Sequence, residues 1–279
     1  MTLKAQPLRG RTILMSGGSR GIGLAIARRA AQDGANVALL AKTDQPHPRL
    51  EGTVHTAAEE IEAAGGQAVG IVGDVRHEED VQRAVTQTVE RFGGIDIVLN
   101  NASAIDLSPS TELAMKKFDL MQQIEIRGTF LLTRTTIPHL RESSHAHVLT
   151  LSPPLNLSER WLGSSVGYML AKYGMTLAAL GFAAELKPDG VASNTLWPRT
   201  IIATAAVQNL LGGEAAMARS RRPEIMADAA HAILSRPPAD QTGQTLIDEE
   251  VLAVAGITDL SPYGYGTGGE LQPDIFVDG

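Results

Sequence analysis

Short runs of consecutive apolar residues alternate along the chain with longer stretches in which apolar residues recur at helical spacing. The runs are continuous rather than interleaved with polar residues, which is typical of strands buried on both faces of a parallel sheet. This pattern predicts strands at residues 12–15, 36–41, 68–72, 95–99, 147–151, 191–196 and 244–247. We therefore expect a parallel sheet of about seven strands.

The stretches between these runs predict helices roughly at 21–33, 53–64, 78–91, 110–141 and 164–187. Gly34, Gly65 and Gly93 stand where three of these helices should end, because a C-cap favours a residue that tolerates positive φ. Strands and helices in strict alternation predict an α/β fold, a Rossmann-type doubly wound parallel sheet with helices on both faces.

The chain shows no linker-like segment, repeat or low-complexity tract, so a single domain over residues 1–279 is expected, with 250–279 as a C-terminal extension. That extension contains several glycines between aromatic residues and Pro273. We expect it to be coil on the protein surface, and a flap over a pocket is the alternative.

Composition narrows the possible functions. The formal net charge of −7 argues against a nucleic-acid partner, because binding phosphate backbones needs clustered Lys and Arg. The chain has no cysteine, which excludes disulfides and thiolate metal sites and fits a cytoplasmic location. No run approaches the ~18 apolar residues of a membrane span. His145 and His147 lack an evident third ligand, so no metal is expected.

A glycine-rich loop follows the first predicted strand and opens the first predicted helix, with the sequence Ser16-Gly17-Gly18-Ser19-Arg20-Gly21-Ile22-Gly23. Gly17 allows the tight turn, Gly21 allows close approach to a pyrophosphate, and Gly23 allows the helix to pack on the strand. The helix N-terminus then presents free N–H groups to phosphates. A glycine loop taken alone also fits a structural turn with no ligand.

Three further motifs follow this G-x-x-x-G-x-G loop in order. Asp74-Val75 follows the third strand, Asn100-Asn101-Ala102-Ser103 follows the fourth, and Tyr168-Met169-Leu170-Ala171-Lys172 lies in a predicted helix. Over residues 8–250 the chain resembles the short-chain dehydrogenase/reductase family, whose pattern is T-G-x-x-x-G-x-G, N-N-A-G and Y-x-x-x-K. The resemblance implies an NAD(P)-dependent enzyme that works as a homodimer or homotetramer. It also implies cofactor contacts at Gly17, Ser19, Arg20, Gly21, Ile22, Gly23, Asp74, Val75, Asn101, Ala102, Lys172, Pro198, Thr200 and Ile201.

A narrower resemblance, to the hydroxysteroid dehydrogenase-like protein 2 branch of that family, comes from four segments. They are residues 41–48, 152–157, 196–198 and 271–274. In that branch a sterol-carrier-type lipid-binding domain can follow the reductase domain, and we expect this chain to correspond to the reductase domain only. The resemblance suggests a lipid-like substrate.

The second predicted strand ends at Leu40-Ala41-Lys42, without the acidic residue that would accept a hydrogen bond from the ribose 2′-hydroxyl of NAD. Arg20 and Lys42 together could clamp a 2′-phosphate through charge-assisted hydrogen bonds. Asp44 lies two residues further on and could reach a ribose hydroxyl instead. We expect NADP to be preferred over NAD.

Hydride transfer at a carbonyl carbon requires a proton to move on the oxygen. A neutral tyrosine, with a pKa near ~10, needs a nearby cation to serve as the acid–base. Tyr168 and Lys172 are i and i+4 and therefore share one helix face. The resemblance assigns the acid–base role to Tyr168, and to Lys172 the roles of lowering its pKa and holding the nicotinamide ribose.

Two positions depart from the family pattern. The family's catalytic serine aligns by strand end with Pro153, so Ser152 or Asn156 would have to substitute, although Ser152 should point to the opposite strand face. We keep Ser152 as the candidate donor. The family's asparagine aligns with Glu125, whose main-chain carbonyl could still serve the lysine. After the sixth strand, Arg199 replaces a family glycine beside Pro198.

The sequence therefore predicts an NADP(H)-dependent oxidoreductase acting on a hydroxyl or carbonyl group, with Tyr168, Lys172 and Ser152 as its catalytic residues. The alternative is an NADP(H)-binding sensor or scaffold with little or no turnover. Pro153 and Glu125 favour the alternative, whereas the intact Tyr168 and Lys172 favour the enzyme. The substrate is expected to be a small molecule.

Overall fold

The computed structural model describes residues 7–46, 52–266 and 269–278, so His47 and Pro48 of the branch-specific motif lie outside the described residues. Its strands are β1 (Thr12–Ser16), β2 (Asn36–Ala41), β3 (Gln67–Val72), β4 (Ile97–Asn100), β5 (His147–Thr150), β6 (Ala192–Trp197) and β7 (Thr245–Ile247). Within this part of the chain they form one seven-stranded sheet in the order β3-β2-β1-β4-β5-β6-β7. Every neighbouring pair is parallel.

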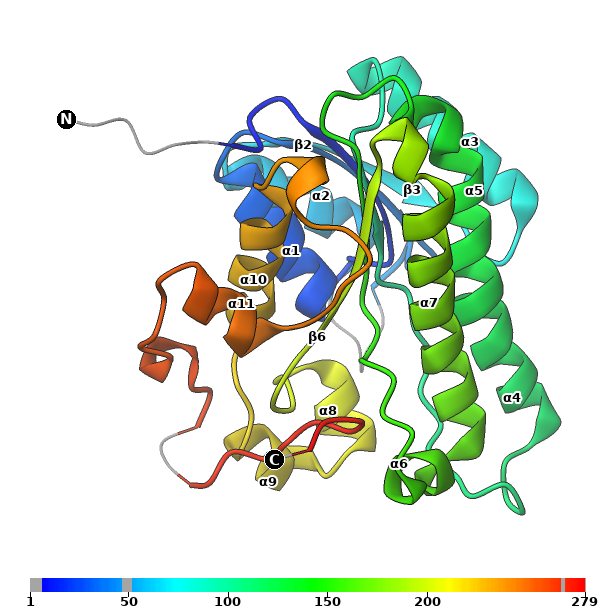
Figure 1. The fold of residues 1–279 in the computed structure, drawn as a ribbon, viewed down its shortest axis with the longest axis vertical. Helices are drawn as coiled ribbons and strands as arrows, with labels where there is room; N and C mark the ends of the chain where they lie inside the picture. The colour runs from blue at the N-terminus through cyan, green and yellow to red at the C-terminus, as the bar shows by residue number, and fades with distance from the viewer. Residues whose placement is uncertain (1–6, 47–51, 267–268, 279) are drawn as a thin grey trace.

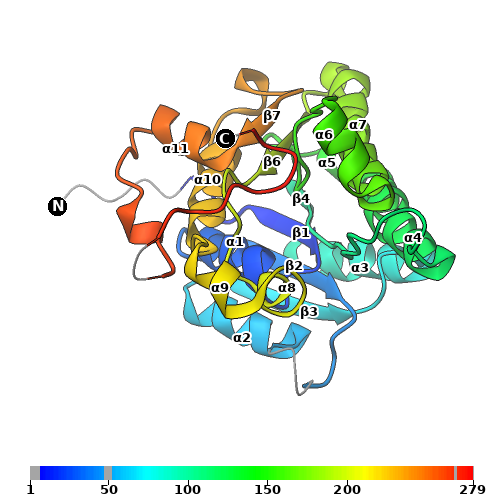
Figure 2. The ribbon, with the colours of Figure 1, turned by 90° about the horizontal axis from the view of Figure 1, so that it is seen from below.

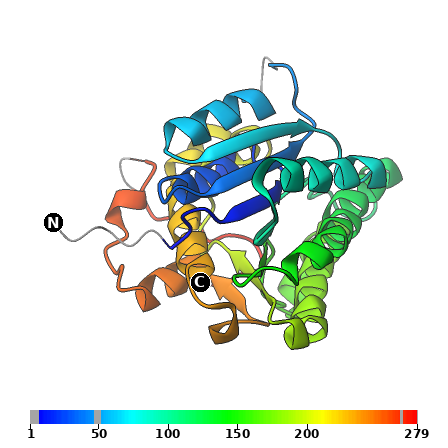
Figure 3. The ribbon, with the colours of Figure 1, turned by 90° about the horizontal axis from the view of Figure 1, so that it is seen from above.

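Helices cover both faces of the sheet (Figures 2 and 3). One face carries α1 (Gly21–Ala31), α2 (Val54–Ala63) and α10 (Glu224–Leu234). The other carries α3 (Glu78–Phe92), α5 (Gly128–Leu140) and α7 (Val166–Glu185). Shorter helices are α4 (Met115–Gln122), α6 (Glu159–Ser164), α8 (Ala205–Leu210), α9 (Gly213–Ala218) and α11 (Asp248–Val254). The predicted doubly wound α/β fold is confirmed.

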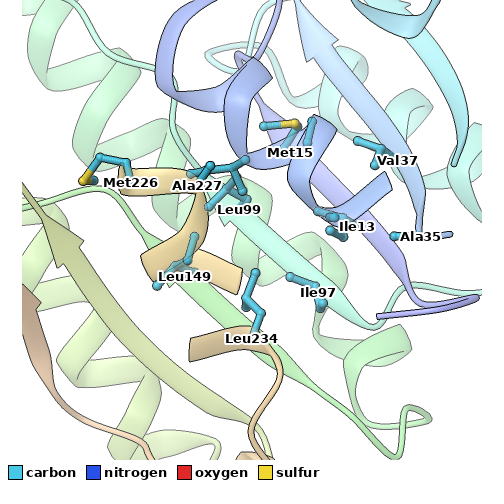
Figure 4. Close-up of a cluster of buried hydrophobic side chains, with 14 of the residues drawn as sticks. Ile13, Met15, Ala35, Val37, Ile97, Leu99, Leu149, Met226, Ala227 and Leu234 are labelled. Atoms are coloured by element: carbon cyan, nitrogen blue, oxygen red, sulfur yellow. The ribbon is translucent and has the colours of Figure 1, made fainter. Parts of the chain in front are cut away.

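The two faces of the sheet explain why the strand sequences are continuously apolar. Successive side chains of a strand point to opposite faces. Ile13 and Met15 of β1 therefore join the core under α1 and α10, drawn in Figure 4, whereas Leu14 joins the core under α3, α5 and α7. All three side chains are fully buried. Both cores need apolar residues, so no polar position interrupts the run.

The helix predicted at 110–141 is divided in the structure. It begins only at Met115, and a π-helical turn at Gln123–Arg127 separates α4 from α5. A π turn widens the helix locally and redirects its side chains, and such turns often occur at functional sites. Here the turn carries Glu125, which is fully buried and points toward the residues that follow β4.

The end of the chain differs from the surface coil expected from the sequence. Residues 269–278 return across the carboxyl ends of the strands, past α8 and α9 and toward α6 (Figure 1, red). Ile201 donates its backbone N–H to Gln272, and Asp274 donates its own to Arg199, both at 3.0 Å. Phe276 is only 1% exposed and has the one positive φ, 69°, among the described non-glycine residues. We call residues 269–278 the flap, because this coil packs Phe276 against four other aromatic rings.

We predict that Phe276→Ala releases this flap. Truncating a buried phenylalanine removes about 3–5 kcal/mol of packing free energy, which is more than the free energy that keeps most local segments closed. Hydrogen exchange of residues 269–278 should accelerate at least about 10-fold, while that of the central strands stays unchanged. Tyr265→Ala is the matched control, since Tyr265 is an aromatic residue of the same region that is 49% exposed. Equal exchange in both variants would contradict the anchoring role of Phe276.

Candidate functional site

The glycine loop lies where the strand order reverses direction, because β1 is paired with β2 on one side and with β4 on the other. Ligands of doubly wound sheets bind in the crevice at this point. The side chain of Asn101, which follows β4, occupies the space beside the loop and donates to the Ser16 carbonyl at 3.1 Å. A Cβ on Gly17 or on Gly23 would lie 2.5 or 2.6 Å from Asn101 Nδ2, so both positions require glycine.

The N-terminus of α1 fits the pyrophosphate of a dinucleotide. Arg20, at the N-cap, makes no side-chain capping bond, and the first turn holds no acidic residue. The first amide groups of the helix therefore have no intrahelical acceptor and point outward with the positive end of the helix dipole. Gly21 has a φ of +59°, a backbone conformation that favours glycine. Gly17, Ser19, Arg20, Gly21, Ile22 and Gly23 all belong to this cradle.

Asp74 and Val75 follow β3 on the same edge of the sheet. Asp74 forms an ion pair with Arg76, whose Nη2 lies 2.7 Å from Oδ2, and a longer one with Lys42 at 3.7 Å. Although burial opposes it, the hydrogen bonds and charge of Arg76, together with Lys42, lower the pKa of Asp74 to about 2. Arg76 is a residue that the sequence analysis missed. Val75 and Ala102 are two further residues predicted to contact the cofactor. Val75 is buried, and the backbone N–H of Ala102 donates to Ser16 Oγ at 3.2 Å.

The far side of the crevice is formed by the residues after β6. Pro198, Thr200 and Ile201 are buried there beside the flap. The hydroxyl oxygen of Thr200 has no hydrogen-bond partner among the described residues. A buried polar atom without a partner is rare in a folded protein, and it fits a ligand such as the nicotinamide carboxamide. The Arg199 guanidinium pairs with Glu250 and donates to the Asp278 carbonyl of the flap.

Tyr168 and Lys172 lie on one face of α7, and each is only 3% exposed. The ammonium of Lys172 donates to the Leu151 carbonyl at 3.1 Å and lies 6.0 Å from the centre of the Tyr168 ring. Burial lowers the pKa of Lys172, while the charges of Glu125 and Asp274 act to raise it. The sequence thus predicted two residues that the fold brings together in a closed site.

The Tyr168 hydroxyl is a weak acid in this environment. Burial raises its pKa well above the usual value, and the negative charges of Glu125 and Asp274 raise it further. The Ser103 hydroxyl acts in the opposite direction and lowers the pKa of Tyr168. Ser103 stands where the family pattern has glycine, and its role was missed in the sequence. The missing serine at position 153 was the signal that could have prompted a search for another hydroxyl.

Ser152, the predicted third catalytic residue, faces α7 instead of the crevice. Its hydroxyl is fully buried and lies 2.9 Å from Thr176 Oγ1. Ser152 is expected on the strand face opposite that of residue 153, and its contact with Thr176 of α7 agrees with this expectation. Asn156, the second candidate, donates its amide to Asp278 of the flap at 2.7 Å. Neither side chain has a hydrogen bond to Tyr168 among the described residues.

Aromatic rings close the site on the side of the flap. The Phe276 ring lies 6.1 Å from that of Tyr168 at an interplanar angle of 21°, and 5.1 Å from that of Tyr173. Trp161 and Trp197 complete the cluster, and the Trp161 indole also donates to Asp278 at 2.9 Å. The site is therefore apolar where a substrate would approach the tyrosine. No periodic pattern in the sequence marks these contacts.

Neither a metal centre nor a membrane span is found in the described part of the chain. No group of three or more His, Cys, Asp or Glu residues there is arranged to hold a metal ion. His145 and His147 each contact a backbone carbonyl through Nε2. None of the described helices combines the length and apolar character needed to cross a bilayer.

Comparison with known proteins agrees with this geometry. A model of the short chain dehydrogenase family matches residues 11–214. The chain is 52% identical over 272 residues to hydroxysteroid dehydrogenase-like protein 2 of Danio rerio, an alignment that covers 98% of this chain and 65% of that protein. The chain thus spans slightly less than two thirds of that relative. The resemblance to this branch is confirmed.

Two solved structures are similar over nearly the whole chain. A short chain dehydrogenase of Mycobacterium thermoresistibile is 59% identical with a TM-score of 0.92, covering 97% of this chain and 96% of that one. A structure from Xanthomonas campestris is 54% identical with a TM-score of 0.94, covering 98% of this chain and 99% of that one.

We predict that the flap loosens as the pH rises. Burial raises the pKa of Asp274 to about 7, with Asp248 adding to the effect, and burial raises that of Asp248 to about 6. Both values exceed those of an unfolded chain, so their contribution to stability is complete below about pH 4 and is lost as the pH rises through 6 and 7.

Hydrogen exchange of residues 269–278, corrected for its intrinsic pH dependence, should therefore accelerate between pH 5 and pH 8. Asp274→Asn should flatten this dependence, whereas the exposed Asp240→Asn should preserve it. The same dependence in both variants would refute the role of Asp274.

Proposed function

The chain belongs to the short-chain dehydrogenase family, and on that premise we propose that it is an NADP(H)-dependent oxidoreductase acting on a hydroxyl or carbonyl group of a small molecule. The observation that carries the proposal is the pairing of Tyr168 with Lys172, both buried, with the Lys172 ammonium bonded to the Leu151 carbonyl just beyond β5. A binding protein without chemistry has no need of that tyrosine.

The bound nicotinamide supplies the hydride acceptor or donor. Tyr168 gives a proton to the substrate oxygen during reduction and takes it back during oxidation. Lys172 places a positive charge beside the tyrosine and the crevice, where low exposure strengthens its field. The rings of Phe276, Trp161 and Trp197 exclude water from the reacting atoms.

The preference for NADP rests on charge at the end of β2. Arg20 lies at the mouth of the glycine loop and Lys42 directly follows β2, with its side chain 58% exposed. Asp44, the residue that could instead have bound a ribose hydroxyl, has its carboxylate 2.8 Å from His55 Nε2. Because Asp44 is bonded to His55, it does not compete for the ribose, and Arg20 and Lys42 favour the recognition of a 2′-phosphate.

The apolar character of the site favours an apolar, lipid-like substrate. Tyr168 belongs to a buried cluster with Met121, Trp161 and Trp197, and Leu113 and Leu155 pack against it. A substrate whose hydroxyl or carbonyl group is attached to a hydrocarbon body matches such a lining. Its entry requires the flap to move, because Phe276 stacks on the tyrosine ring.

Assembly as a homodimer or homotetramer in the cytoplasm is part of the proposal. Phe130 on α5 and Leu170 and Leu177 on α7 are 51%, 45% and 58% exposed. Neighbouring apolar side chains exposed on two adjacent helices are typical of a protein–protein interface.

The alternative function, an NADP(H)-binding sensor, draws support from one observation, the orientation of the Ser152 hydroxyl toward Thr176.

Tyr168→Phe should lower turnover about 1,000-fold, because it removes only the proton donor. The affinity for NADPH should change little, since the ring and its packing are preserved. Fluorescence transfer from Trp161 and Trp197 to bound NADPH measures that affinity independently of turnover. Unchanged turnover would overturn the mechanism. Tight binding by the wild type without turnover of any alcohol or carbonyl compound would favour the sensor.

Arg20→Ala combined with Lys42→Ala should weaken NADPH binding about 100-fold and NADH binding less than about 3-fold, since each lost charge-assisted hydrogen bond contributes about 1.5–3 kcal/mol. Because Arg20 also donates to the Gly52 carbonyl at 2.8 Å, Lys42→Ala alone should be measured too, with an expected loss of about 10-fold for NADPH. Arg28→Ala, also on α1, is the matched control. Equal weakening of both cofactors would contradict the preference for NADP.

A further inference from the structure

The ring of Phe276 is held among four aromatic side chains, one of which is the reacting tyrosine. Its centre lies 6.1 Å from that of Tyr168 at an interplanar angle of 21°, so these two rings are stacked. The rings of Trp161, Tyr173 and Trp197 lie 6.0, 5.1 and 6.4 Å away and are tilted by 58°, 54° and 52°. Stacked and tilted contacts are those that flat aromatic rings prefer. We call these four residues the aromatic cage, and its shape fits one flat ring.

Two walls of the cage are held by contacts that do not involve Phe276. The Tyr173 hydroxyl donates to the Asn156 carbonyl at 2.6 Å. The Lys172 ammonium lies 5.3 Å from the ring centre of Trp197, and a cation over an aromatic face attracts the ring. The cage should therefore keep its shape when the Phe276 ring leaves, as a preformed ligand site does.

Phe276 occupies the cage in a strained backbone conformation. Its φ of 69° lies in the left-handed region, which bulky side chains rarely adopt. Such strain persists only where the surrounding packing imposes it, and here that packing is the cage, which leaves Phe276 1% exposed. A free ring of the same shape can enter the cage without this strain. It can therefore compete with Phe276 for the same place.

Tyr168 is closed to a substrate while Phe276 is in place. The tyrosine is only 3% exposed, and the Phe276 ring covers one of its faces. A ring that replaces Phe276 stacks on Tyr168, and the tyrosine hydroxyl is attached to that same ring. A carbonyl or carbinol carbon bonded directly to the replacing ring therefore lies near the hydroxyl, as proton transfer requires.

We propose that the aromatic cage is the subsite for a ring of the substrate, and that Phe276 fills it in the free protein. The substrate class is then a ketone or secondary alcohol whose reacting carbon is bonded to an aromatic ring. The inference rests on the proposed function and names the substrate of that site.

The reaction of such a substrate is balanced. In reduction the carbonyl carbon receives the hydride of a reduced nicotinamide, and the oxygen receives the Tyr168 proton. The C=O π bond breaks as a C–H and an O–H bond form, so an aryl ketone becomes a benzylic alcohol. Tyr168 regains its proton from water when the product leaves. Oxidation of the alcohol runs the same steps in reverse.

The test uses two ketones with the same number of carbon atoms, acetophenone and the linear 2-octanone, added to the full chain. The chain has five phenylalanines, so labelling with para-fluorophenylalanine gives few fluorine resonances, and that of Phe276 is the one missing in Phe276→Leu. Acetophenone should move this resonance to the position of a solvent-exposed ring, and 2-octanone should leave it unchanged. The resonance of Phe182, which is buried in the core under α3, α5 and α7, is the internal control.

Affinity provides a second readout that needs no turnover. In calorimetric titrations the dissociation constant of acetophenone should be about 10-fold lower in Phe276→Ala than in the wild type, because the fraction of molecules with an empty cage increases. Tyr265→Ala is the matched control and should bind acetophenone as the wild type does, since Tyr265 is 49% exposed. With NADPH, kcat/KM of the wild type should be at least about 10-fold higher for acetophenone than for 2-octanone.

A Phe276 resonance that stays in place at the highest soluble concentration of acetophenone would overturn the inference, even where both ketones are reduced. The same holds for a resonance that 2-octanone moves equally, or for equal affinities of Phe276→Ala and the wild type. A resonance that acetophenone moves in a protein without turnover of either ketone would contradict the proposed function alone, because the cage then binds a ring without chemistry.

Discussion

The buried ammonium group of Lys172 is the constraint around which the site is arranged. A positive charge in an apolar interior is stable only beside negative groups and hydrogen-bond acceptors. The protein supplies the Leu151 carbonyl at 3.1 Å and two carboxyl groups, Glu125 and Asp274, whose charges stabilise the ammonium form. One carboxyl comes from the π-helical turn and the other from the flap. The charge of Lys172 thus interacts with two segments that lie far apart in the sequence.

This electrostatic arrangement also sets the properties of Tyr168. The carboxyl groups that compensate Lys172 oppose loss of the tyrosine proton, so the lysine does not by itself make Tyr168 acidic in this structure. The Ser103 hydroxyl acts in the opposite direction and lowers the pKa of Tyr168. The same hydroxyl donates to Glu125 Oε1 at 2.5 Å. The flap shields these groups from water, which strengthens every charge interaction inside.

Sequence patterns predicted those parts of the molecule that depend on short-range regularity. Continuous apolar runs identified the strands, the glycine spacing identified the cradle, and the i, i+4 spacing identified Tyr168 with Lys172. The contacts of the flap and of Ser103 escaped, because they join segments without periodicity. Phe276 reaches Tyr168 only after the sheet and its helices have formed. The π turn escaped as well, since one extra residue in a helical turn hardly disturbs the apolar period.

The displaced hydroxyl group has a simple geometric basis. β4 and β5 are neighbours in the sheet, and their last residues, Asn100 and Thr150, are paired. Ser103 and Pro153 each stand three residues beyond this pair, at the beginnings of two adjacent loops. Both loops leave the same edge of a parallel sheet, so a hydroxyl lost from one can be replaced from the other without rebuilding the fold. Glu125 contacts the same loop, because Ser103, three residues beyond β4, donates its hydroxyl to Glu125 Oε1 at 2.5 Å.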